Sequence, residues 1–589
     1  MLLALIMSLC IFNSCNTDTP DESTVPDTTL PVVEETLPVQ TENVLFEPGV
    51  CDYRIVYPSD DTDAEFNAAR KLQGIIEGHC GVKPEIVRAT KSNTEASDPS
   101  VKEILLSFLD YEEFDTAISS VGYNDYVITL IGNKLVITGH EREGFNRAFE
   151  EFVSFISSKT VDGKLVVDND LMISGKAGNK DYKSFYEVPG YPGGKIEDIS
   201  LLGNSYTQVT IYDTDKEMYE AYAPRLEADG YSLYSENVIA ENTYSTYTRE
   251  DEMLYYYFCP NTGETRVIIA EDVNLPSLDE VKYTKVCEPA FICLRSLGDK
   301  GTVSGDSQGC IIRFADGSFM IYDGGNNNSY QAKQIYETLI NYAPDPQKVV
   351  VRAWVFSHFH GDHIGAFRNY VERYRNNKTV TIEGFIFNFC DTVEQTETIS
   401  PGQMAAVESA IKYLNSDVPV YKCLTGQIYR FPGMDMEILA CMSDFIPLVI
   451  GYERADADKS KGDGNSMSTV VRLKTPEGNT CMLTGDSTNI VLDCMVDRYG
   501  AEYLDSDIVT TPHHAHNRES YRARNATIKF YDAVKPEILV VTSPNMNKFT
   551  PTGSYPYEVN VHVIKTYDPT IYKMDKLSLI SLETLKEIK

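Results

Sequence analysis

The sequence predicts an α/β protein: a sandwich of two β-sheets with helices on both outer faces, preceded by two smaller α+β domains. Three observations predict this class. The chain has 589 residues, more than one domain usually needs. Strand and helix patterns alternate over residues 286–589. Two apolar runs in that part of the chain end in histidine-rich loops, as expected where strands deliver side chains to one edge of a sandwich.

The start of the chain predicts export and a lipid anchor. Residues 1–12 are almost entirely apolar but too few to span a bilayer. Residues 11–15 resemble a bacterial lipoprotein cleavage site, so residues 1–15 are interpreted as a lipoprotein signal with Cys15 as the lipidated residue. A plain secretory signal is the alternative. Residues 16–45 are rich in Thr, Pro, Asp and Glu and predict a disordered tether, which places the protein outside the cytoplasm as a bacterial membrane lipoprotein.

Residues 48–175 predict an α/β accessory domain. The expected elements are a strand over 53–58, a helix over 63–78, strands over 84–87 and 103–106, a hairpin over 126–139 and a helix over 144–157. Pro58, residues 81–84 and residues 132–139 resemble the non-catalytic N-terminal domain of α-glucuronidases and β-hexosaminidases. The resemblance implies a polysaccharide-related context, with a glycan as a candidate partner, and no catalytic residue. The spacing of Cys51 and Cys80 leaves a disulfide between them open.

Residues 195–282 predict an α+β domain in which we recognise no chemistry. A helix is expected over 216–229, with a kink or an early end at Pro224. Strands are expected over 243–249, 253–259 and 265–269. The many tyrosines of this unit favour packing within the sheet over stacking on sugars.

The formal net charge of −35 argues against broad nucleic-acid binding, because an acidic chain repels the phosphate backbone at long range. A cleft that contains metal ions can still accept a single phosphodiester, because the ions dominate the local field.

The first histidine-rich loop predicts a metal site. His358, His360, Asp362 and His363 lie within six residues, directly after the apolar run 349–356, and the chain has only nine histidines. Neutral imidazoles and carboxylates suit one or two Zn²⁺ ions, and Mn or Fe are alternatives.

The pattern His-x-His-x-Asp-His resembles the signature of the metallo-β-lactamase superfamily and predicts a catalytic domain of that kind over residues 286–589. The resemblance implies that His358 and His360 bind one metal and that Asp362 and His363 face a second. Asp362 then also orients or deprotonates the attacking water.

Two later motifs supply further candidate ligands. Asp486, after the strand-like residues 481–484, resembles the superfamily's bridging aspartate. The strand-like residues 507–511 precede His513 and His514, which resemble its last ligand motif. We prefer His513 as ligand of the second metal and His514 as a supporting neighbour or general acid, but His514 as the ligand stays open. His516 is either a substrate contact or an exposed loop residue, the second being favoured.

Two residues are expected to support the ligands. Asp323, in Asp323-Gly324-Gly325, resembles the superfamily aspartate that hydrogen-bonds to the histidine loop. Asn465 stands where many members have another histidine, so it is a weak ligand or none. This Asn-Ser form is similar to the metallo-β-lactamase-like domain of bacterial competence proteins, where glycine usually follows the paired histidines. Here Ala515 replaces that glycine.

Together these features predict an extracytoplasmic, metal-dependent hydrolase. The expected substrate is a small or polymeric phosphorylated molecule, such as a phosphodiester or phosphorylated envelope or glycan material. The alternatives are a carboxylic ester or lactam hydrolase, and a glycan-binding surface lipoprotein with an auxiliary hydrolase domain.

Overall fold

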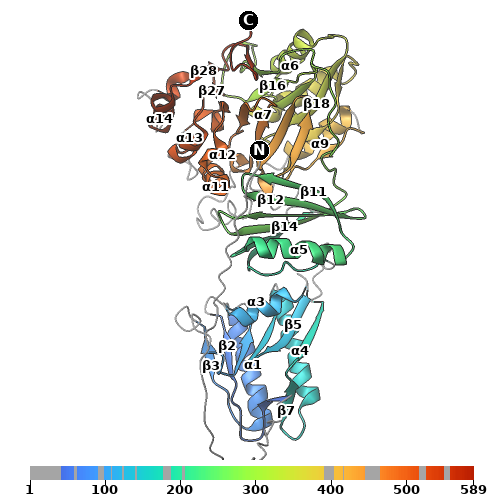
Figure 1. Cartoon of the computed structure of the whole chain (residues 1–589), viewed down its shortest axis with the longest axis vertical. Helices are drawn as coiled ribbons and strands as arrows, with labels where there is room; N and C mark the ends of the chain where they lie inside the picture. The colour runs from blue at the N-terminus through green and yellow to red at the C-terminus, as the bar shows by residue number, and fades with distance from the viewer. Residues whose placement is uncertain are drawn as a thin grey trace, which may run out of the picture.

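The computed structural model describes residues 42–589 except 59–62, 90–97, 108, 110, 122–124, 140–141, 177–187, 202–205, 390–402, 415–416, 445–463, 517–525 and 550–557. The predicted lipidation site Cys15 and most of the predicted tether lie outside the described residues. The predicted fold class, a multidomain α/β protein, is confirmed: three units follow one another along the long axis of the molecule (Figure 1).

The N-terminal unit is a six-stranded sheet with helices on both faces. Its strand order is β3-β2-β4-β6-β5-β8, and β2 (Arg54–Tyr57), β3 (Ile86–Arg88), β4 (Glu103–Leu106) and β6 (Lys134–Gly139) are parallel. The antiparallel partners are β5 (Asp125–Ile131) and β8 (Met172–Lys176). Helices α1 (Asp63–Cys80) and α4 (Arg142–Lys159) share one apolar core, whereas α3 (Glu112–Ser119), which the sequence did not predict, packs in another. A separate pair joins β1 (Glu42–Phe46) to β7 (Leu165–Asp168).

The middle unit is an antiparallel sheet with one helix. Its order is β11-β12-β13-β14-β10-β9, formed by β9 (Lys195–Leu201), β10 (Tyr206–Tyr212), β11 (Ser232–Ile239), β12 (Asn242–Arg249), β13 (Glu252–Cys259) and β14 (Glu264–Glu271). Helix α5 (Lys216–Ala228) continues four residues past Pro224, so the expected early end at that proline is wrong. The Asp215 side chain accepts a hydrogen bond from Met218 N at 2.8 Å and caps this helix.

The two faces of the middle sheet have different partners. Tyr256 packs with α5, whereas Tyr244, Tyr255 and Tyr257 belong to the same apolar core as the C-terminal unit. All four tyrosines are at most 1% exposed. They fill the interior of the protein and are not available to stack on sugars.

The C-terminal unit is a sandwich of two mixed sheets. The first has the order β21-β20-β18-β17-β16-β15-β29, with β19 also beside β18, and the second the order β22-β23-β24-β25-β26-β27-β28. The first contains β15 (Ala290–Cys293), β16 (Gly309–Arg313), β17 (Phe319–Asp323), β18 (Val349–Val355), β19 (Val380–Ile382), β20 (Phe385–Ile386), β21 (Val420–Tyr421) and β29 (Ser578–Ser581). The second contains β22 (Ile428–Phe431), β23 (Met434–Ala440), β24 (Val470–Lys474), β25 (Thr480–Leu483), β26 (Ile508–Thr510), β27 (Ile538–Val541) and β28 (Thr570–Lys573).

A core of buried side chains from both sheets lies between them, and helices cover the outer faces. The first sheet carries α6 (Ser329–Tyr342), α7 (Gly361–Tyr374) and α9 (Gln403–Leu414). The second carries α11 (Asn489–Tyr499), α12 (Ala501–Leu504), α13 (Ile528–Val534) and α14 (Glu558–Tyr567) (Figure 1). The layers therefore follow the predicted order α-β-β-α.

The cysteines of the described residues are all free thiols. The suggested disulfide between Cys51 and Cys80 is therefore not present: Cys51 Sγ lies 3.8 Å from Leu45 O and Cys80 Sγ lies 3.5 Å from Val82 O. Within the described part of the chain, no helix combines the length and the apolar content needed to cross a membrane.

Candidate metal centre

The candidate ligands meet at one edge of the sandwich. In the first sheet, β17 and β18 run parallel, and Asp323 and the loop with His358 and His360 lie at their carboxyl ends. In the second sheet, β25 and β26 run parallel, and Asp486 and His514 follow their carboxyl ends. Because the carboxyl ends of parallel strands lie at the same edge, residues distant in sequence converge there.

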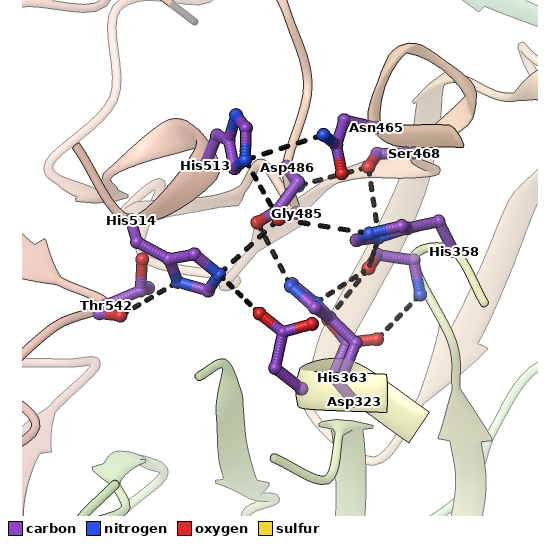
Figure 2. Close-up of polar contacts among 12 residues, drawn as sticks. Asp323, His358, His363, Asn465, Ser468, Gly485, Asp486, His513, His514 and Thr542 are labelled. Atoms are coloured by element: carbon purple, nitrogen blue, oxygen red, sulfur yellow. Dashed lines mark hydrogen bonds and ion pairs between the residues drawn. The ribbon is translucent and has the colours of Figure 1, made fainter. Parts of the chain in front are cut away.

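Two groups of side chains could each hold a metal ion. One consists of Asp362, His363, Asp486 and His514, and the other of His358, His360 and Asp486. Within each group the candidate ligand atoms all lie within 4.8 Å of one another. Asp486 belongs to both groups, and Figure 2 shows its carboxylate between His358 and His514.

Three imidazoles present the same nitrogen to this centre. His514 Nδ1 donates to the Thr542 carbonyl at 2.9 Å, which leaves Nε2 facing Asp486 Oδ2 at 3.4 Å. His363 Nδ1 lies 2.8 Å from Asp323 Oδ2, and its Nε2 faces Asp486 Oδ1 at 3.0 Å (Figure 2). His358 Nδ1 lies 3.0 Å from Ser357 Oγ, and its Nε2 lies 3.8 Å from Asp486 Oδ2. Such contacts to Nδ1 fix the tautomer and ring orientation of metal-binding histidines.

The polar atoms at the centre fit a divalent cation as ligand atoms. His358 Nε2, His363 Nε2 and Asp486 Oδ1 are buried, and none has a hydrogen-bond partner of good geometry among the described residues. Buried polar groups are ordinarily satisfied, so these three atoms need an explanation. Imidazole nitrogen and carboxylate oxygen are ligands of zinc and related divalent metals, so the donor set fits a divalent ion.

Asp323 lies directly beneath the first histidine loop. It is fully buried, and its carboxylate accepts hydrogen bonds from Ser357 N at 2.7 Å and Ser357 Oγ at 2.8 Å as well as contacting His363. Its φ of 58° is left-handed, a conformation that aspartate tolerates better than most residues. These are the supporting contacts that the sequence analysis expected of Asp323.

Neighbouring charges shift the pKa values of these residues in the opposite direction to burial. Burial alone would lower the pKa of His514, but the carboxylates of Asp486 and Asp362 raise it to about 9. Burial alone would raise the pKa of Asp362, but the hydrogen bond from His514 and the nearby His363 hold it well below its usual range. Histidines 363, 514 and 513 likewise keep the pKa of Asp486 low despite its burial. The carboxylates are therefore ionised, as ligands of a cation must be.

The structure brings His514, rather than His513, into the second group. His514 is 2% exposed, and its Nε2 lies 3.2 Å from Asp362 Oδ2. His513 Nε2 lies 3.8 Å from Asp486, its side chain is 18% exposed, and it contacts Asn465 Nδ2 at 3.4 Å. This geometry favours the alternative that was left open, His514 as the ligand: residues 513–515 are three consecutive left-handed residues, with φ of 45°, 54° and 59°, and the second imidazole faces inward.

The other candidates lie around this centre. Asn465 is 8% exposed and lies beside His513 in the 3-10 turn Gly464–Met467. His516 is not the exposed loop residue that we favoured: its side chain is 17% exposed, and its Nε2 lies 2.8 Å from Asp306 Oδ2.

Ser468 and Thr542, for which no role was predicted, also contact the candidate ligands. Ser468 Oγ accepts from Asp486 N at 3.0 Å and lies 3.3 Å from His358 Nδ1, and Thr542 holds His514 through its carbonyl oxygen. The signal for Thr542 was its position directly after the apolar strand β27, because other strand ends of this sheet also supply the centre.

No family model and no curated protein matches this chain. Among solved structures, the metallo-β-lactamase fold protein YhfI from Bacillus subtilis is 10% identical, with 50% of this chain and 100% of YhfI covered and a TM-score of 0.30. Unliganded yeast PDE1 is also 10% identical, with 49% of this chain and 98% of PDE1 covered and a TM-score of 0.29. At TM-scores this low, the fold rests on the sheet topology and the site on the ligand geometry described above.

Proposed function

We propose that this protein is an extracytoplasmic metal-dependent hydrolase that cleaves phosphodiesters or phosphorylated envelope or glycan material. The observation that carries the proposal is Asp486, one buried carboxylate shared by two groups of candidate ligands. Neighbouring cation positions are the arrangement that stabilises both the attacking and the leaving oxygen in phosphoryl transfer. The signal-like residues 1–15 support a place outside the cytoplasm.

Each of the two groups of residues would hold one metal ion. His358, His360 and Asp486 would hold one ion, and His363, His514, Asp362 and Asp486 a second. A divalent ion held there lowers the pKa of water and polarises a substrate oxygen. Zinc is the ion that we propose, and manganese or iron are outcomes of the same metal test.

Asp362 is the group of the cluster best placed to move a proton. Its side chain is 37% exposed, whereas those of His358, His363, Asp486 and His514 are at most 2% exposed. It lies in the first turn of α7, where the helix dipole favours a negative charge. An ionised carboxylate at this boundary can orient an attacking water and accept its proton.

The proposal is tested by hydrolysis assays on chelator-stripped protein with Zn²⁺ or Mn²⁺ added back. The probes are bis(4-nitrophenyl) phosphate, 4-nitrophenyl phosphate, 4-nitrophenyl acetate and a chromogenic β-lactam. We expect metal-dependent turnover of the phosphodiester, and preferred turnover of the acetate or the lactam would instead support the ester or lactam alternative.

Asp362→Asn should lower kcat for the phosphodiester by about 100-fold or more, because the amide cannot accept the proton. Asp532→Asn is the matched control, since Asp532 contacts His562 at 2.6 Å on the outer helices α13 and α14. Equal activities of the wild type and both variants, or no metal-dependent turnover of any probe, would contradict the proposal.

A further inference from the structure

The loop that carries His514 has an unfavourable backbone conformation that a single internal hydrogen bond, from His516 N to His513 O at 2.8 Å, closes into a turn. Residues 513–515 are three consecutive non-glycine residues with positive φ. Left-handed backbone is unfavourable for L-residues with a side chain and persists only where surrounding contacts impose it. The orientation of His514 toward Asp362 and Asp486 therefore depends on contacts from outside the loop.

Two side chains from distant segments hold the carbonyl groups of this loop. Lys548 Nζ donates to His514 O at 2.9 Å. Asn560 Nδ2 donates to Ala515 O at 2.9 Å and to Lys548 O at 3.0 Å, so it ties the loop and the lysine together. Lys548 lies in the 3-10 turn Met546–Phe549 and Asn560 in α14.

The charge of Lys548 is balanced by Asp306, which lies in the segment before β16. The Lys548 side chain is 7% exposed, and its Nζ lies 2.8 Å from Asp306 Oδ2. A buried ammonium is stable only with such a partner. The same carboxylate oxygen lies 2.8 Å from His516 Nε2, so Asp306 also fixes the side chain of His516, the residue that follows the loop. Asp306 precedes β16 of the first sheet, whereas Lys548 and His516 belong to the half of the chain that builds the second sheet.

We propose that Asp306, His516, Lys548 and Asn560, here called the loop-holding cluster, are positioning residues for the second metal position. They act by fixing the backbone that aims His514. The inference rests on the proposed function, since it assumes that the two groups bind metal. It requires the effect to be selective, because Ser357 and Ser468, which lie outside this cluster, contact His358 Nδ1.

The test measures how tightly each of the two metal ions binds, by competition with a chelator, and records the absorption spectrum of the cobalt(II) protein. The first equivalent is the ion at the His358 group, and the second equivalent is the ion at the His514 group. His360→Ala and His514→Ala assign the two equivalents, because each removes a ligand from one group only. In Lys548→Met we expect the second equivalent to bind at least about tenfold more weakly and its cobalt spectrum to change, while the first equivalent is retained. Lys548→Arg, which keeps a charged donor, should restore part of the loss.

Two surface pairs provide matched controls. Lys529→Met removes a lysine that contacts Asp497 at 2.5 Å and is 44% exposed, and it should leave both equivalents unchanged. Should Lys548→Met fail to fold, Asp306→Asn removes the charge with little change of shape, and Asp532→Asn is its control.

The outcomes separate this inference from the proposed function. Wild-type affinity for both equivalents in Lys548→Met and Asp306→Asn would overturn the inference while the proposed function stands. A parallel weakening of both equivalents would also overturn it, because the cluster would then only stabilise the fold. A wild-type protein that binds no metal would overturn the proposed function itself.

Discussion

Asp486 has two oxygens that face different histidines. Oδ1 faces His363, and Oδ2 faces His514 and His358. The sequence predicted Asp486 through its resemblance to the superfamily's bridging aspartate and its place shortly after an apolar strand. The same reasoning predicted His358, His360, Asp362 and His363 as neighbours.

The choice between His513 and His514 was not predictable from residue pattern. It depends on positive φ values at three residues with side chains, and sequence patterns indicate such a conformation mainly through glycine. Ala515 has a φ of 59°, a conformation that glycine adopts without strain. Contacts from Lys548 and Asn560 impose the conformation here, and neither residue lies near the loop in sequence.

Asp323→Asn is expected to weaken metal binding by about 10- to 100-fold, because the carboxylate orients His363 and the 357–363 loop. Asparagine tolerates the left-handed backbone, so the effect should come from the lost carboxylate oxygen. The free energy of unfolding should fall by about 1–3 kcal/mol, since a buried donor loses its partner. Chelator competition and denaturant unfolding measure the two effects, and unchanged metal affinity would show that Asp323 does not support the ligands.

At the scale of elements, long periodic segments were predicted well and short or edge elements were not. Helices α1, α4 and α5 and strands β12 to β14 match their predicted positions within a few residues. β11 is an edge strand in which only Ile239 is buried, so it lacks the alternation of a half-buried strand. α3 has eight residues, too few for a helical period to stand out.

The junction between β25 and the Asp486 loop depends on close packing at Gly485. Its φ is 55°, and a Cβ there would lie 2.8 Å from Ser357 Cβ and 3.0 Å from Ser468 Cβ. Ser357 and Ser468 both contact His358 Nδ1, so displacing them moves a candidate ligand.

Gly485→Ala should therefore lower both stability, by about 1–3 kcal/mol, and the affinity of the His358 metal position. Gly478→Ala is the matched control, because Gly478 also has a positive φ, of 98°, but its Cβ would meet no atom within 4 Å. The control should lose about 1 kcal/mol of stability through backbone strain alone and keep its metal affinity. Equal metal affinity in Gly485→Ala and Gly478→Ala would contradict this prediction.

At the scale of the whole molecule, the middle unit and the sandwich share one interior. Glu264 and Arg266 of β14 lie 2.5 Å apart, and Arg498 of α11 lies 3.7 Å from Glu264 and 3.0 Å from Asp444. All four side chains are at most 8% exposed. The Tyr257 hydroxyl donates to Asp444 at 2.5 Å across the same boundary. We infer that the middle sheet is an integral support of the sandwich.

Glu264→Gln should lower the free energy of unfolding by about 3–5 kcal/mol at neutral pH, because it leaves two buried arginines with one carboxylate. Burial alone would raise the pKa of Glu264, but Arg266 and Arg498 lower it. A lowered folded-state pKa contributes stability that is present above about pH 4.5 and is lost as the pH falls below it. The difference in free energy of unfolding between wild type and variant, measured with a denaturant, should thus shrink as the pH falls. A difference that grows below pH 4.5 would contradict this role of Glu264.

The central claim is that Asp486 is shared by two cations. A crystal structure of the full chain grown with Zn²⁺, with anomalous data collected on both sides of the zinc absorption edge, tests it most directly. We predict two anomalous peaks beside Asp486, one contacted by His358 Nε2 and the other by His363 Nε2 and His514 Nε2. Peaks elsewhere in the protein, with none within bonding distance of Asp486, would contradict the claim.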